Sequence, residues 1–294
     1  MDLTAIQRYA DQYQMTLFDH AVMTENGISE LVTGKGNPLN NSYSVAKCYA
    51  ATAIGLLWDE GKIGLDEPVL DVLKGEYDGY GDKRWEKVLV RHALGHTMGI
   101  EHGYLDIDTE DVQSYGTDDF LQFAFSAPLS FEPGTEYCYS DAAYYIVSRL
   151  VSRRAGEKLD EYLMRKLLWP MHVQEAAFSR CPRNHPIGAT GLYIRARDMV
   201  KLGYLYAQRG MWEGKQLISE KWIEQEEREL FAYYRSEEVS GVFCKGGMRG
   251  QMLLYSPEKK YAAAWHSFTV DDRDEGLLKC TCDAVENQLK IKEE

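Results

Sequence analysis

The chain has 294 residues, of which 45% are hydrophobic and 27% charged, and its formal net charge is -13. This charge would repel nucleic-acid phosphates and anionic membrane surfaces, so neither is an expected partner. No apolar run is long enough to cross a bilayer, and the composition is typical of a soluble globular protein.

The N-terminal part is predicted to form a short amphipathic helix followed by two antiparallel strands. Strand-like runs at residues 16–24 and 28–33 are joined by Glu25, Asn26 and Gly27. An Asn-Gly pair between such runs is a strong hairpin signal, because the tight turn needs positive φ. Residues 1–5 lack the basic and apolar regions of a secretory signal, which predicts a cytoplasmic protein if Met1 is the natural start.

The next segment predicts a buried central helix that begins at Ser44. Residues 44–58 are apolar nearly all round, and Gly61 follows as a C-terminal stop. A helix-rich region with an acidic loop at residues 103–119 comes next. The remaining elements are expected to be helices at residues 196–209 and 219–230, strands at 250–256 and 260–266, and a polar helix end at 287–294.

Because strands occur near both chain ends, the fold class is predicted to be α/β, in the α+β sense. A mostly antiparallel sheet would be flanked by helices, with an inserted helical region. We expect residues 1–65 and 191–294 to form the sheet lobe and residues 66–190 the helical lobe of one continuous domain.

Ser44 and Lys47 form a Ser-x-x-Lys sequence at the start of the central helix. Residues three apart lie on one face of a helix, so the Lys47 amine is expected to reach the Ser44 hydroxyl. Lysine is normally protonated at neutral pH, and burial or a nearby cation such as Lys245 would have to lower its pKa. The pattern predicts a serine nucleophile with its own base.

The predicted oxyanion site combines the backbone amides of Ser44 and Met248. A helix N-terminus places amide groups and a positive dipole end near Ser44. Gly247 and Gly250 would allow close backbone approach around Met248.

Several stretches together resemble the serine β-lactamase and penicillin-binding-protein superfamily, in its class C β-lactamase-like and esterase-like branch. Ser44 and Lys47 match the first motif, and Lys245, Gly246 and Gly247 stand at the third. The second motif, Tyr-x-Asn in that branch, is present as Tyr139, Ser140 and Asp141. Two further similar stretches are residues 90–99 and 191–198.

Two departures from the family pattern bear on the chemistry. Asp141 replaces an asparagine, and a carboxylate beside Lys47 favours the charged lysine, which would make Tyr139 the more important proton carrier. Gly246 replaces a hydroxyl residue that helps lactam-recognising relatives hold the substrate carboxylate. Lys245 could still attract an anion, but the departure favours ester or amide hydrolysis over lactam hydrolysis.

Three other groups of residues could suggest a zinc site, a calcium site or disulfides, but structural roles are expected for each. His92 and His96 have a zinc-binding spacing but no Glu between them and no third ligand, so packing roles are expected. The acidic residues of the 103–119 loop lack the glycine and bidentate glutamate of a calcium loop. The six cysteines are irregularly spaced and are expected to be reduced thiols, with Cys48, Cys138 and Cys244 serving as small buried side chains.

The sequence predicts a serine hydrolase that cleaves a small-molecule ester, amide or peptide through an acyl-enzyme on Ser44. Lys47 and Tyr139 would carry protons, Asp141, Lys245 and Gly247 would act on substrate or electrostatics, and neither metal nor organic cofactor is expected. One alternative is a β-lactamase or D-alanyl carboxypeptidase, although the apparent lack of export argues against periplasmic substrates. The other is a catalytically inactive binding module on the same fold. The oligomeric state is left open.

Overall fold

The computed structural model describes residues 1–33, 39–269 and 273–293. The chain divides into two compact units. The sheet unit consists of Met1–Val45, Tyr193–Leu217 and Tyr233–Glu294. The helical unit consists of Ala46–Leu192 and Ile218–Ala232.

The sheet unit is built on six antiparallel strands in the order β2-β1-β11-β10-β9-β8. The predicted hairpin is confirmed, since Thr24 of β1 pairs with Gly27 of β2. The elements of this unit are α1 Thr4–Gln12, β1 Thr16–Thr24, β2 Gly27–Val32, β3 Asn40–Asn41, η1 Tyr43–Val45, β5 Leu192–Ile194 (entering at the boundary), α8 Ala196–Ala207, β6 Met211–Trp212, β7 Lys215–Gln216, β8 Tyr234–Arg235, β9 Phe243–Gly247, η5 Met248–Gly250, β10 Gln251–Ser256, β11 Tyr261–Phe268 and α10 Arg273–Glu293.

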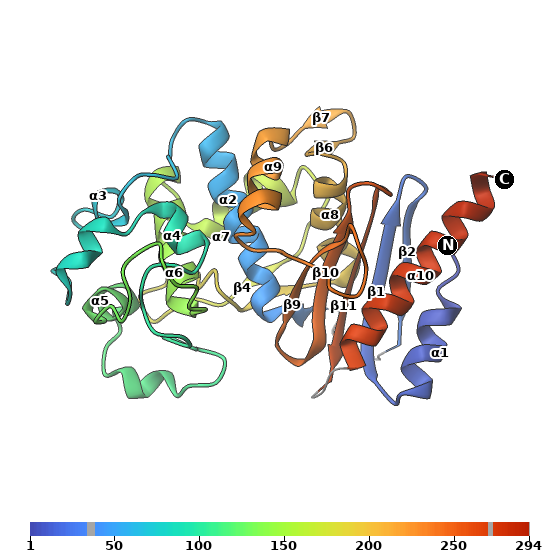
Figure 1. The fold of residues 1–294 in the computed structure, drawn as a ribbon, viewed down its shortest axis with the longest axis horizontal. Coiled ribbons are helices and arrows are strands. Elements are labelled where there is room, and N and C mark those ends of the chain that lie inside the picture. Colours follow the sequence, from blue (N-terminus) through green and yellow to red (C-terminus); the bar gives the residue numbers. More distant parts are fainter. Residues whose placement is uncertain (34–38, 270–272, 294) are drawn as a thin grey trace. The chain divides into compact units, whose positions relative to one another are not determined.

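Helices cover both faces of this sheet, because alternate residues of each strand point to opposite sides. On one face, α1 and α10 lie against the strands (Figure 1). They bury an apolar cluster there that includes Leu254 and Trp265. On the other face, α8 packs against β1, β10 and β11, where Gly203 lies close to Leu253 and Ala262. The predicted antiparallel sheet flanked by helices is confirmed.

Asp19 fixes the start of α8 to the sheet. One of its carboxylate oxygens accepts the backbone N–H of Ala196 at 2.9 Å. The other lies 2.8 Å from Nδ1 of His266 on β11. A carboxylate at a helix N-terminus satisfies an otherwise unpaired amide and matches the helix dipole.

The helical unit is organised around α2, which is buried along almost its whole length. It packs against α6, α7 and α9 within this unit. The elements of the unit are α2 Ala46–Asp59, α3 Val69–Val72, η2 Lys83–Lys87, α4 Val90–Leu94, η3 Val112–Tyr115, α5 Phe120–Ser126, α6 Asp141–Ala155, α7 Leu159–Leu163, the π-type turn η4 Met164–Leu168, β4 Ala177–Phe178 and α9 Glu220–Glu229.

The two units have different bounds from the lobes expected at residues 1–65, 66–190 and 191–294. Residues 46–65 and 218–232 group with the helical unit. The reason is packing, because α2 contacts α6 and α7, and α9 contacts α2. The boundary predicted after residue 65 therefore differs from the observed one, since the central helix α2 packs within the helical unit.

Most predicted elements agree with the structure to within a few residues. Ser44 lies in the 3-10 turn η1, and regular α-helix begins at Ala46. The polar helix end predicted at residues 287–294 belongs to α10, although Glu294 lies outside the described residues. Across the described ranges, no helix combines the length and apolar character needed to cross a membrane.

We predict that Gly55→Ala destabilises the helical unit. A Cβ at residue 55 of α2 would overlap the indole of Trp222 on α9, and both residues are buried. Overpacking a filled core costs about 1–3 kcal/mol. Chemical denaturation should show this loss in the free energy of unfolding.

Gly79→Ala is the matched control, because no atom lies within 4 Å of a Cβ built at that position. It should leave the free energy of unfolding nearly unchanged. Equal stability of Gly55→Ala and the wild type would show that the α2–α9 contact is looser than described.

Candidate active site

A buried ion pair lies at the start of two helices of the helical unit. Lys47 is the second residue of α2, and Asp141 is the first residue of α6. The Lys47 Nζ donates to Asp141 Oδ1 at 2.7 Å and to the carbonyl oxygen of Ala189 at 2.9 Å. Lys47 is 0% and Asp141 is 5% exposed, so the pair is shielded from solvent.

This geometry holds Lys47 in its charged form. Burial by itself would lower the pKa of the Lys47 ammonium, but the charge of Asp141 and the Tyr139 side chain outweigh it and raise that pKa above its ordinary value. The Nζ atom also lies 4.7 Å from the centre of the Tyr139 ring. The structure therefore brings three of the predicted site residues together, Lys47, Tyr139 and Asp141.

His96 supports the tyrosine. Its ring stacks on that of Tyr139, with 4.5 Å between ring centres. The backbone N–H groups of the two residues that flank Tyr139 both donate hydrogen bonds to His96. The Cys138 N–H donates to the His96 carbonyl oxygen at 2.8 Å, and the Ser140 N–H donates to His96 Nδ1 at 3.3 Å. These bonds hold His96 at φ 54°, a left-handed conformation that costs free energy for a residue with a side chain.

A second carboxylate, that of Asp108, interacts electrostatically with both members of the ion pair. Asp108 accepts a hydrogen bond from Thr190 Oγ1 at 3.0 Å. Thr190 follows Ala189, whose carbonyl binds Lys47. Burial, together with repulsion from Asp141, raises the pKa of Asp108. The acidic loop thus contributes a carboxylate near Lys47, which the sequence reasoning treated only as part of a solvated loop.

In the sheet unit, Ser44 lies in η1, and this turn packs against β9. A Cβ at Gly247, the last residue of β9, would overlap the carbonyl oxygen of Ser42. Only glycine allows this approach, so the strand end runs directly beside the turn that carries Ser44. Lys245 is a buried residue of the same strand, and Met248 begins η5 immediately after it.

The Gln251 side chain holds the turn that contains Met248 in place through hydrogen bonds. Its side-chain amide donates to the carbonyl oxygens of Met248 at 3.0 Å and Ser267 at 2.8 Å. Its Oε1 accepts the N–H of Ser267 at 3.2 Å. Gln251 is therefore a residue that positions the turn, and it was not among the predicted site residues.

His92 and His96, which have a zinc-binding spacing in the sequence, do not lie on the same helix. His92 lies in α4, where its Nδ1 accepts the N–H of Leu89 at 3.2 Å, whereas His96 follows that helix. Within the described ranges, no group of three metal-ligating side chains gathers to hold a metal ion. Both histidines form hydrogen bonds to backbone groups of the helical unit, and the His96 ring also stacks on that of Tyr139.

All six cysteines lie in the described ranges and are free thiols. Cys48 and Cys244 are buried as expected, and burial raises the pKa of Cys244 to about 12. Cys138 is only half-buried. None of these thiols is therefore arranged as part of a disulfide.

Comparison with known proteins identifies the family to which this chain belongs. The Beta-lactamase family model matches residues 39–276, which is most of the chain. The chain belongs to the beta-lactamase family. The matched range contains Ser44, Lys47, Tyr139, Asp141 and the third motif.

Two relatives that this chain resembles are named for different hydrolytic activities. An N-acetylmuramyl-L-alanine amidase of Bacillus subtilis is 28% identical over 46% of this chain and 32% of its own length. Esterase EstB of Burkholderia gladioli is 28% identical over 46% of this chain and 37% of its own length. The matched part spans about a third of the length of these relatives.

A solved structure shows the fold. The octameric penicillin-binding protein homologue from Pyrococcus abyssi superposes with a TM-score of 0.79, covering 98% of this chain and 78% of that one. The two sequences are 17% identical. The β-lactamase-like fold predicted from the motifs is confirmed.

We predict that Asp141→Asn lowers the pKa of Lys47. The substitution removes the negative charge while leaving Lys47 buried, so the effect of burial is no longer outweighed. An NMR titration of the carbon next to the Lys47 amine, assigned from its loss in Lys47→Arg, should show the fall directly.

Asp108→Asn is the matched control. It removes a carboxylate from the same surroundings without touching the 2.7 Å hydrogen bond between Lys47 and Asp141. Its effect on the Lys47 pKa should have the same direction and be smaller. An unchanged pKa in Asp141→Asn would contradict the assignment of Asp141 as the group that keeps Lys47 charged.

Proposed function

We propose that the chain is a serine hydrolase that cleaves an ester or amide through an acyl-enzyme on Ser44. The observation that carries this proposal is the buried Lys47–Asp141 ion pair with the partly buried Tyr139 ring beside it, in a chain of the beta-lactamase family whose Ser44 precedes Lys47 by three residues. A serine with a lysine and a tyrosine that can carry its proton supplies the groups that acyl transfer requires.

In the proposed reaction, Ser44 Oγ bonds to the substrate carbonyl carbon while its proton leaves through the lysine–tyrosine pair. Because Asp141 keeps Lys47 charged, we assign the first proton acceptance to the Tyr139 oxygen. The charged Lys47 Nζ, 4.7 Å from the centre of the Tyr139 ring, would attract the negative charge that develops on the substrate and the tyrosine during this transfer. Breaking the ester or amide bond releases an alcohol or amine, which takes the proton back.

The acyl-enzyme would then be hydrolysed by water, whose proton follows the same route. We assign stabilisation of the negatively charged oxygen to the amides of Ser44 and Met248. Two contacts support this assignment, because each holds one of the amides in place within the sheet unit. The turn η1 packs against β9, and the Gln251 side chain donates a hydrogen bond to the Met248 carbonyl oxygen.

The third motif favours esters and amides over lactams. At Gly246 the chain lacks the hydroxyl with which, by the family resemblance, lactam-hydrolysing relatives hold a carboxylate. The names of the two relatives, an esterase and an amidase, are compatible with this choice. Lys245 and Gly247 are proposed to border the substrate, and a cytoplasmic location stays a prediction from the N-terminal residues.

We predict that a fluorophosphonate probe labels the wild type once and does not label Ser44→Ala. The Ser44 oxygen would displace fluoride from phosphorus, which mimics the first step of acylation. Intact-mass measurement should show a single adduct. Ser114→Ala, which removes an exposed serine elsewhere in the helical unit, should keep the adduct.

Each other outcome has a definite meaning. An adduct on Ser44→Ala would place the reactive nucleophile at another residue. Absence of an adduct from both proteins would favour the binding-module alternative, in which the fold holds a ligand without acylation.

We also predict that Asp141→Asn raises turnover and moves the acid limb of the pH–rate profile to lower pH. Without the carboxylate, a smaller rise in pH makes Lys47 neutral, so that Lys47 itself can accept the Ser44 proton. The basic form of the site is then present at lower pH. Rates with a simple ester from acid to alkaline pH check this, and an unchanged profile would refute it.

A further inference from the structure

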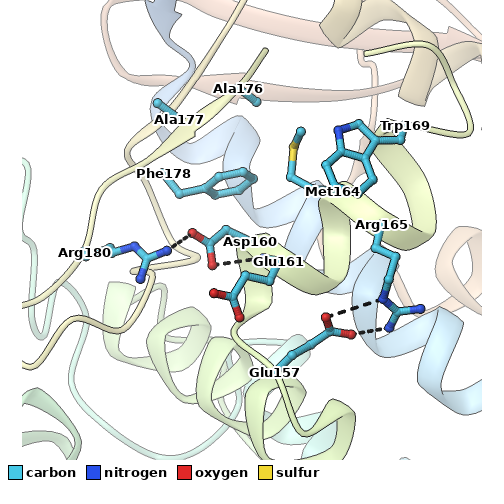
Figure 2. A pocket seen from close by; sticks show the side chains of 10 residues that line it. All are labelled: Glu157, Asp160, Glu161, Met164, Arg165, Trp169, Ala176, Ala177, Phe178 and Arg180. Carbon is cyan, nitrogen blue, oxygen red and sulfur yellow. Dashed lines mark hydrogen bonds and ion pairs between the residues drawn. The ribbon is translucent and has the colours of Figure 1, made fainter. Parts of the chain in front are cut away.

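A cavity of about 590 Å³ in the helical unit has no part in the proposed chemistry. Its lining comes from α7, the π-type turn η4 and the segment around β4 (Figure 2). In that view the Met164 side chain lies between the rings of Phe178 and Trp169. Small-molecule sites have volumes of this size and apolar walls with a few polar groups.

Trp169 is exposed to an unusual degree. Its side chain is 58% exposed, whereas Trp85, Trp222 and Trp265 are fully buried. All six tryptophans lie in the described ranges, and Trp169 is the one with an exposed indole. Trp169 is grouped with the partly buried Met164 and Phe178, and apolar side chains that stay together at the surface are typical of interaction sites.

The backbone beneath these side chains is irregular. Trp169 N–H donates to the carbonyl oxygen of Met164, five residues earlier, at 2.9 Å. This is the bond of a π-type turn, which changes the direction of side chains on either side of it and is frequent at functional sites. The turn brings Met164 and Trp169 to the same cavity.

The charges of the lining favour a cationic ligand. Glu157 is paired with Arg165, and Asp160 is paired with Arg180 (Figure 2). The third carboxylate, Glu161, accepts the backbone N–H of Lys158 at 3.0 Å. Three carboxylates against two guanidinium groups leave one negative charge, and it belongs to Glu161.

We propose that this cavity binds an organic cation whose ammonium nitrogen carries alkyl groups. The faces of Trp169 and Phe178 attract a positive charge, and the alkyl groups fill apolar space beside Met164. Glu161 supplies the counter-charge. An anionic ligand would meet net repulsion, and a neutral ligand would gain nothing from Glu161. The proposal does not depend on the reaction at Ser44.

Choline is a suitable probe, with a neutral alcohol of the same shape, in which a tert-butyl group replaces the trimethylammonium group, as comparison. Each is titrated into the full chain carrying isotope-labelled indole nitrogens. The Trp169 signal is identified from its loss in Trp169→Phe. We expect choline to shift this signal saturably and the neutral alcohol to have little effect.

Glu161→Gln should weaken choline binding about tenfold, because it removes the counter-charge while its amide oxygen still accepts from Lys158. Glu224→Gln, which neutralises an exposed glutamate on α9 outside the cavity, should leave affinity unchanged. No saturable shift, equal shifts from both probes, or unchanged affinity in Glu161→Gln would each overturn the proposal.

Discussion

The ion pair between Lys47 and Asp141 is the interaction on which the site depends. Each charge is enclosed, and either alone would be costly to bury, so the two residues require one another. Their contact joins the first turns of α2 and α6, and the bond to Ala189 adds a third segment. Tyr139 lies two residues before Asp141, the first residue of α6, so the same pair fixes the segment that carries the tyrosine. One substitution relative to the family pattern, aspartate for asparagine, thus sets both local architecture and protonation.

Much of the fold could be predicted because its signals are local. Asn26 and Gly27 predicted the hairpin through backbone conformation, and the helix after Ser44 is apolar on every side because it is buried on every side. The grouping of Lys47, Tyr139 and Asp141 followed from the first two motifs of the family pattern. The bounds of the two units did not follow, because they depend on which helices α2 contacts, and this information is not local.

The residues missed in the candidate site act through contacts distant in sequence. Asp108 bonds to Thr190 across 82 residues, and the left-handed conformation of His96 is held by groups more than 40 residues later. Nothing in the residue type of either position marks such a role. The cavity at Trp169 was missed for a related reason, since one π-type hydrogen bond changes the faces on which side chains of an ordinary helical sequence lie.

The two glycines of the third motif differ in how much change they tolerate. At Gly247 a side chain would meet backbone, the Ser42 carbonyl, and would push the turn bearing Ser44 away from β9. At Gly246 the nearest atom is the Tyr234 hydroxyl, 3.3 Å from a Cβ, at the movable end of a side chain. A hydroxyl residue could therefore be placed at position 246 with a small movement of the Tyr234 side chain, whereas position 247 has to stay glycine. Natural drift or laboratory evolution thus has an open route from this chain toward carboxylate-bearing substrates.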